Sequence, residues 1–127
     1  MSIAFNHTIV AAKDKAESAA FFTELFGLPP AKPFGPFLAV ELDHGVSLDF
    51  IDSGDDVRPQ HYAFLVSEAD FDAIYGRIRE RGIQHWADPH GHRPGEINHN
   101  DGGRGVYFCD LGGHYLEILT RPYGSGS

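Results

Sequence analysis

The chain has little cysteine, no long apolar run and no basic leader segment. Cys109 is the only cysteine among 127 residues, so an internal disulfide is excluded and a reducing compartment is expected. No stretch approaches the roughly 20 apolar residues of a membrane-spanning helix. The N-terminus lacks the basic and apolar segments of a signal peptide. These absences predict a cytoplasmic protein without a membrane partner.

Positive charge is also scarce. Ten Lys and Arg residues against 18 Asp and Glu residues give a net charge of -8. Nucleic acids and anionic membranes select basic surfaces, so we expect neither as a partner. Aromatic residues, in contrast, are plentiful, with ten Phe and five Tyr. They can furnish a core, an apolar pocket or a dimer interface, and a hydrophobic content of 42% indicates a globular fold.

The sequence contains two copies of one pattern. A short apolar strand with a histidine near its start occurs at His7 and again at His61. Each of these strands precedes an amphipathic segment that begins with a helix-capping residue. Each copy then ends in a strand with a carboxylate inside an apolar run, Asp49 in the first copy and Glu117 in the second. Each copy therefore offers a histidine and a carboxylate at matching places.

These elements predict an α+β fold built from two pseudo-symmetric βαβββ modules, which together form a cup-shaped, partly open β-barrel. Strands are expected at 3–11, 37–42, 46–51, 60–66, 83–86, 106–109 and 114–120, and helices at 14–26 and 67–82. The modules cover about 1–52 and 59–121 of a single domain, 1–121, and 122–127 is expected to be a flexible tail. A loop as long as 87–105 is often functional.

Two histidines and a carboxylate are predicted to form a metal site. Strand alternation places His7, His61 and Glu117 on faces that the helices leave open. Such a triad holds one divalent transition metal (Fe, Mn, Zn, Ni or Co) and leaves positions for substrate or water. A buried carboxylate also needs a partner, and a metal is one. The alternative is that both histidines are hydrogen-bonded core residues and that Glu117 pairs with an arginine.

Five residues are predicted to act beside or within this site. Asp49 is a fourth ligand, a general base or a polar residue of the cup, and it and Glu117 are the candidate catalytic bases. Tyr107 and Ser47 face the cup and are expected to bind substrate, with simple packing as the alternative for Tyr107. Arg104 is expected to hold an anionic substrate group, against the alternative of a surface charge.

The motifs resemble the vicinal oxygen chelate superfamily, which includes glyoxalase I, extradiol dioxygenases and bleomycin-resistance proteins. The resemblance covers 3–121 and rests on four segments: Asn6-His7-Thr8, 21–28, His61-Tyr62-Ala63-Phe64 and 107–117. It implies that His7, His61 and Glu117 are metal ligands. It also implies that Asp49 stands where glyoxalase I has a fourth ligand.

The local likeness is greatest to fosfomycin-resistance enzymes, which implies a link to antibiotic resistance. Tyr107 matches their phosphonate-contacting tyrosine, whereas Ile97 stands near the place of their phosphonate-binding lysine. Members of the superfamily usually pair, so a homodimer is implied, with a site built within one chain or shared with a swapped partner.

Two functions are considered. The first is a metal-dependent enzyme that chelates adjacent oxygens of a small substrate and stabilises an oxyanion, as an isomerase or lyase, a thiol transferase or a dioxygenase. The alternative is a bleomycin-resistance-type protein that sequesters a drug or natural product without catalysis. The intact triad of metal ligands favours the enzyme.

Overall fold

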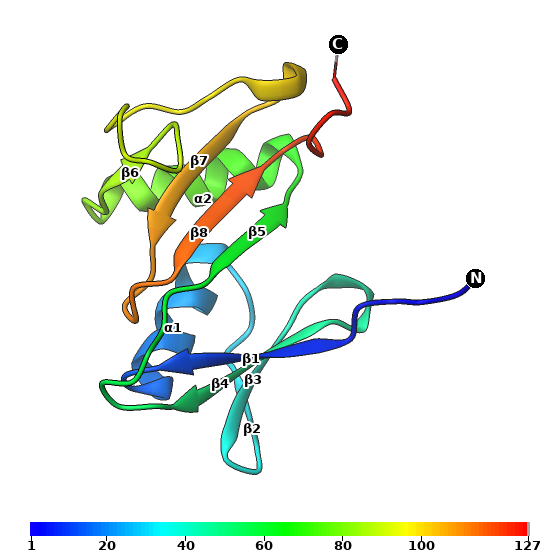
Figure 1. The fold of residues 1–127 in the computed structure, drawn as a ribbon, viewed down its shortest axis with the longest axis vertical. Helices are drawn as coiled ribbons and strands as arrows, with labels where there is room; N and C mark the ends of the chain where they lie inside the picture. Colours follow the sequence, from blue (N-terminus) through cyan, green and yellow to red (C-terminus); the bar gives the residue numbers. More distant parts are fainter. Residues whose placement is uncertain (127) are drawn as a thin grey trace. The chain divides into compact units, whose positions relative to one another are not determined.

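The computed structural model describes residues 1–126, which form two compact units (Figure 1). The first unit is Met1–Arg58, and the second begins at Pro59. Each unit contains one four-stranded sheet and one long helix, so the predicted α+β class with two βαβββ modules is confirmed. Neither sheet closes into a barrel, and the predicted cup shared by the two modules stays a prediction. No helix in residues 1–126 is long and apolar enough to cross a membrane.

The first unit consists, in chain order, of β1 (His7–Ala12), α1 (Lys15–Phe26), β2 (Lys32–Phe34), β3 (Phe37–Glu41), a 3₁₀ turn (Asp43–Gly45) and β4 (Ser47–Asp52). The strand order is β1-β4-β3-β2, with β1 parallel to β4 and the other neighbours antiparallel. The register sets His7 opposite Ser47 and Ile9 opposite Asp49. Pairing in the sheet therefore brings the histidine strand beside the aspartate strand.

Helix α1 forms where its capping signals predict it. The Asp14 side chain accepts a hydrogen bond of 3.0 Å from the Glu17 backbone N–H, and Gly27 ends the helix with a φ of 72°. Phe22 on the buried side of the helix lies 6.1 Å from Phe50 of β4, measured between ring centroids. The helix thus covers one face of the sheet and leaves the other face open.

The predicted strand over 3–11 is wrong at its start, because β1 begins at His7. Its partner β4 begins at Ser47, opposite His7, so the residues before Asn6 have no neighbouring strand to pair with. Strand β2 is not among the predicted strands; it pairs with β3 through a tight turn at Gly35.

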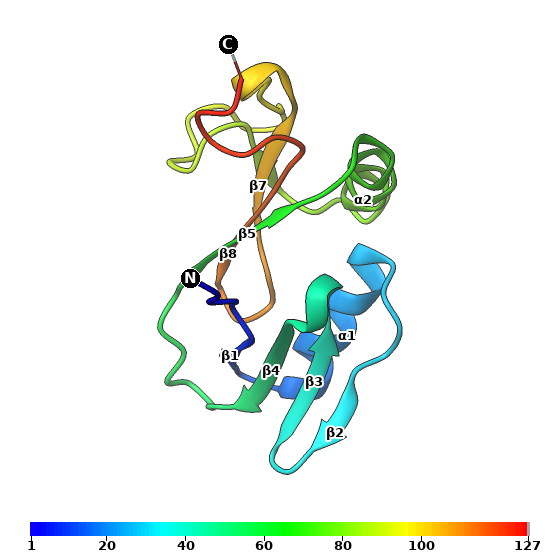
Figure 2. The same cartoon turned by 90° about the vertical axis from the view of Figure 1, so that its right-hand side faces the viewer.

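The second unit consists of β5 (His61–Leu65), α2 (Glu68–Glu80), β6 (His85–Trp86), a 3₁₀ turn (Asn100–Gly102), β7 (Gly105–Cys109) and β8 (Tyr115–Leu119). The strand order is β5-β8-β7-β6, with β5 parallel to β8. Figure 2 shows α2 on one side of this sheet, and the loop after β6 and the C-terminal segment on the other side. Irregular chain therefore covers part of the helix-free face of the second unit.

Helix α2 is fixed by a cap and by its apolar side. The Ser67 hydroxyl accepts a hydrogen bond of 3.0 Å from the Asp70 backbone N–H. Phe71, Ile74 and Ile78, spaced three and four residues apart, are buried. Burial of these three side chains therefore stabilises the helix, as their spacing predicts.

Candidate functional site

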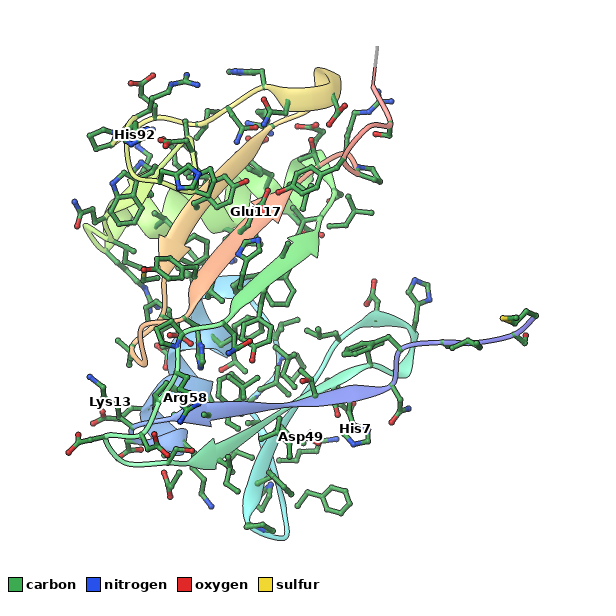
Figure 3. All side chains as sticks on the ribbon, in the orientation of Figure 1. His7, Lys13, Asp49, Arg58, His92 and Glu117 are labelled. Atoms are coloured by element: carbon green, nitrogen blue, oxygen red, sulfur yellow. The ribbon has the colours of Figure 1, made fainter. Side chains whose placement is uncertain are left out.

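Glu117 occupies the centre of the second unit. It lies on β8, an inner strand, opposite Ala63 of β5 and Tyr107 of β7. Only 1% of the residue is exposed to solvent, although its side chain belongs to the face opposite α2 (Figure 3). A carboxylate this buried requires hydrogen-bond partners or a cation.

His61 is one partner of Glu117. Its Nε2 lies 3.1 Å from Glu117 Oε1, and its Nδ1 lies 3.1 Å from the carbonyl oxygen of Tyr115. A carbonyl oxygen only accepts hydrogen bonds, so the Nδ1–H group donates to it and fixes the ring. Nε2 is then the nitrogen that faces the carboxylate. It either carries a proton that it donates to Glu117, or it keeps a lone pair that can bind a cation.

Tyr123 is the second partner, and sequence reasoning missed it. Its hydroxyl lies 2.5 Å from Glu117 Oε1 and 2.6 Å from Oε2. Because that hydroxyl donates to the carboxylate, the Tyr107 hydroxyl, 3.0 Å away, donates to Tyr123. Burial of the hydroxyl, together with these hydrogen bonds, raises the pKa of Tyr123. Tyr123 lies beyond the last strand in the predicted tail, where no periodic pattern marks it.

A cavity of about 820 Å³ opens over this cluster. Its lining is mainly aromatic and includes Trp86, Tyr107, Phe108, Tyr115 and Tyr123, with His61, Pro89, His90, Gly91 and Cys109 completing the wall. Apolar cavities with a few placed polar groups are typical small-molecule sites. The sequence singled out His61 and Tyr107 as candidate site residues but not Trp86, which carries no motif.

The rim of this cavity belongs to the long loop after β6. Asp88 accepts hydrogen bonds from the backbone N–H groups of His90, His92 and Arg93, at 3.3, 3.0 and 2.7 Å. These hydrogen bonds lower the pKa of Asp88, and the bond from His92 has the largest effect. One carboxylate therefore organises the turn that contributes Pro89, His90 and Gly91 to the cavity.

The first unit has a smaller cavity of about 370 Å³, lined in part by His7, Ser47 and Asp49. Figure 3 labels His7 and Asp49 on this unit. His7 Nδ1 lies 2.7 Å from Asn6 Oδ1. An amide oxygen accepts, so the Nδ1–H group donates and Nε2 keeps a lone pair for a ligand. The Ser47 hydroxyl donates to Asp49 Oδ1 at 3.0 Å, and Asp49 is only 8% exposed. Three predicted site residues thus share this cavity.

The donor groups fit a divalent transition metal. Imidazole nitrogen and carboxylate oxygen are the ligands that such metals take in proteins. In the second unit, His61 and Glu117 already converge, and in the first unit His7 has a free ring nitrogen by its hydrogen bonding. Within residues 1–126, no group of three or more His, Cys, Asp or Glu side chains lies together as a complete metal site.

Arg104 is engaged with α2. Its guanidinium lies 2.8 Å from Glu68 and 2.8 Å from Asp72, and it stacks 4.5 Å from the ring centroid of Phe71. The hydrogen bond to Asp72 is the largest of the effects that raise the pKa of Arg104. Its role in substrate binding stays a prediction, and these contacts give it a structural role.

The chain is similar to known enzymes in sequence and in structure. Residues 4–118 match the family model described as "Glyoxalase/Bleomycin resistance protein/Dioxygenase superfamily". The structure of oxidase ChaP-H2 is 63% identical, with a TM-score of 0.96 and 100% of both chains covered. The structure of oxidase ChaP-H1 is 62% identical, with a TM-score of 0.94, 97% of this chain covered and 99% of that chain.

A further relative is the glutathione transferase FosA of Serratia marcescens, which is 31% identical over 120 residues. The match covers 89% of this chain and 77% of that protein. The resemblance to fosfomycin-resistance-type members is thereby confirmed. Together these similarities support a metal-dependent enzyme.

Proposed function

Because the chain belongs to the glyoxalase/bleomycin resistance protein/dioxygenase superfamily, we propose that it is a divalent-metal-dependent oxidase of a small, oxygenated aromatic compound. The superfamily uses one scaffold for several chemistries, so the fold alone does not choose the reaction. Two structures at 62% and 63% identity are named oxidases, whereas the glutathione transferase is 31% identical. Oxidation is therefore favoured over isomerisation and thiol transfer.

One observation carries this proposal. The buried carboxylate of Glu117 and the imidazole of His61, 3.1 Å apart, meet at the wall of an aromatic cavity. A carboxylate and an imidazole at such a place are suited to holding a metal in reach of an apolar substrate.

The proposed ligands are His61 and Glu117, completed by His7. When bound, the metal would act as a Lewis acid toward adjacent substrate oxygens and, as iron, would support oxygen chemistry. The Tyr115 carbonyl keeps the His61 ring oriented by holding its Nδ1–H group.

The cavity indicates the class of substrate. Trp86, Tyr107 and Tyr115 offer aromatic faces on which a planar ring system stacks. The Tyr107 hydroxyl, whose proton is donated to Tyr123, can accept a hydrogen bond from a substrate hydroxyl. In the first unit, the hydrogen bond from Ser47 orients Asp49, the proposed general base.

A homodimer is also proposed. Large apolar side chains on the helix-free faces are exposed, including Ile9 at 54% and Leu65 at 62%. Isolated exposed apolar residues are ordinary, but here they continue the faces that carry His7 and His61. Cover by a second copy would remove this surface from water.

The metal site is tested first by elemental analysis of the full chain, purified without added metal. We expect about one transition metal ion per chain, with iron foremost, and its loss in His61→Ala and Glu117→Gln. His92→Ala is the matched control, because His92 lies in the same unit with its side chain exposed to solvent. Unchanged metal content in His61→Ala would rule out the ligand assignment.

The reaction is tested with an oxygen electrode and a panel of catechols and hydroquinones, with Fe(II), Mn(II), Ni(II) or Zn(II) added. Oxygen uptake that requires both Fe(II) and an aromatic substrate is expected. Tight binding without uptake would instead support sequestration. Consumption of glutathione with an epoxide would support a transferase.

A further inference from the structure

We propose that Tyr123 is a positioning residue for Glu117. Its hydroxyl holds the carboxylate so that Oε1 is presented on the His61 side, where the metal ligands meet. The inference rests on the proposed function, because it takes Glu117 to be a ligand. It assigns a role to a residue beyond the last strand of the fold.

The two partners of Glu117 contact its oxygens unequally. His61 Nε2 contacts Oε1 at 3.1 Å, whereas the Tyr123 hydroxyl reaches both Oε1 and Oε2, at 2.5 and 2.6 Å. Each carboxylate oxygen has two lone pairs, so the carboxylate can accept this hydroxyl and still offer Oε1 to a cation. Tyr123 therefore bridges both oxygens of the carboxylate and fixes its orientation, with Oε1 also facing His61.

Tyr107 fixes the Tyr123 hydroxyl in turn. The two hydroxyl oxygens are 3.0 Å apart, and Tyr107 pairs with Glu117 across β7 and β8. The Tyr107 ring also stacks on the His61 ring, with centroids 6.0 Å apart. A chain of hydrogen bonds thus runs from Tyr107 through Tyr123 to Glu117, and its first member is anchored in the sheet.

The segment after β8 is shaped to bring Tyr123 to this place. The Ser125 backbone N–H and hydroxyl both donate to the Pro122 carbonyl, at 3.1 and 2.6 Å, which closes a turn around Tyr123. The Arg121 side chain donates to the Ser125 carbonyl at 3.2 Å. In Figure 2 this segment returns on the side of the sheet opposite α2. Tyr123 is thus held by local bonds of its own turn.

Carboxylates that bind metals are usually oriented by a second hydrogen bond, and loss of that bond commonly weakens metal binding about 10- to 100-fold. Without the Tyr123 hydroxyl, the Glu117 side chain would be free to turn away from His61. The ring of Tyr123 would still cover the carboxylate in Tyr123→Phe, so this variant removes the hydrogen bond and keeps the packing.

The test compares three tyrosine variants of the full chain. The dissociation constant for Co(II) is measured on metal-free protein by competition with a chromophoric chelator. We expect about 10- to 100-fold weaker binding in Tyr123→Phe and a smaller loss in Tyr107→Phe. Tyr75→Phe is the matched control, because Tyr75 lies on α2 in the same unit, its hydroxyl contacts His85, and it is not among the residues that line the cavity. Its affinity should equal that of the parent.

The visible spectrum of the Co(II) form is the second readout, since it reports ligand geometry. It should change in Tyr123→Phe and stay unchanged in Tyr75→Phe. Equal or tighter Co(II) binding by Tyr123→Phe would overturn the inference, as would an equal loss in Tyr75→Phe. If Tyr123→Phe does not fold, unchanged binding by Tyr107→Phe decides against it. Failure of the parent to bind Co(II) would instead overturn the proposed metal site itself.

Discussion

Asp49 shows how much a single side chain leaves open until its neighbours are known. The sequence allowed a ligand, a base or a polar lining residue. The structure buries it to 8% exposure, in one cavity with His7, with the Ser47 hydroxyl on Oδ1. A carboxylate oriented by a hydroxyl and open to a cavity is suited to moving a substrate proton.

We therefore expect Asp49→Asn to keep its metal and lose turnover. General bases typically contribute about 10²- to 10⁴-fold to rate, and the amide is no base. Ser47→Ala, which removes only the orienting hydroxyl, should lose much less. Metal analysis and kcat are measured on the same samples. Loss of metal along with activity in Asp49→Asn would identify Asp49 as a fourth ligand.

Cys109 gives a prediction that depends on pH. It lines the aromatic cavity, and burial, followed by the nearby Asp110 charge, raises the pKa of its thiol. A raised pKa means less thiolate at any pH near neutrality, and the thiolate is the reactive form. Alkylation by iodoacetamide, followed by mass spectrometry, should be slower than for a free cysteine peptide at pH 8. Faster alkylation than that of the peptide would contradict a raised thiol pKa at Cys109.

Elements with strong local signals were predictable, and elements defined by a partner were not. Helices α1 and α2 have capping residues and, in α2, clear periodicity, so both begin and end close to the expected residues. The start of β1 and the whole of β2 depend on which strand lies beside them, which one sequence segment does not encode. The position of Tyr123 likewise depends on other parts of the chain, because a turn beyond the last strand brings its hydroxyl to Glu117.

The long loop after β6 contributes Pro89, His90 and Gly91 to the wall of the aromatic cavity. Asp88 organises it through the backbone N–H groups of His90, His92 and Arg93. Asp88→Ala should speed hydrogen exchange at these amides and raise KM more than it changes kcat, because the loop forms the cavity rim. His99→Ala, in the same loop with an exposed side chain, is the control.

The lowered pKa of Asp88 gives the sign of a pH effect. Because the folded-state pKa lies below the ordinary value, the stabilisation of the loop is present at neutral pH and is lost as pH falls through that lowered pKa. Exchange protection, corrected for the intrinsic rate, should therefore fall in acid in the parent and be absent throughout in Asp88→Ala. Protection that persists in Asp88→Ala would show that other contacts hold the loop.

At the scale of the whole molecule, the two modules could be predicted because each copy repeats strand, helix and strands in the same order. For the candidate site residues of each unit, the sequence predicted the face of the sheet, since strand alternation puts them on the helix-free side. The surface used for assembly could not be predicted, because it depends on which side chains the fold leaves exposed. The exposure of Ile9 and Leu65 is known only from the structure.

A mixed-dimer experiment tests how the proposed ligands are shared. If His7 of one copy completes the pair formed by His61 and Glu117 of the other, a dimer of one His7→Ala chain and one His61→Ala chain keeps one intact ligand set. We expect sharing, because a second copy that covers the apolar helix-free faces comes to lie against the faces that carry these ligands.

The two variants are purified with different affinity tags, mixed in mild denaturant, refolded, and selected for dimers that carry both tags. Each variant alone should bind no metal, whereas the mixed dimer should bind about one ion per dimer because one of its two ligand sets is restored. A mixture of His61→Ala with Glu117→Gln is the control. His61 and Glu117 belong to the same unit, so each of the two sites in this mixed dimer lacks one ligand. Metal-free mixed dimers would mean that each chain supplies all three ligands by itself.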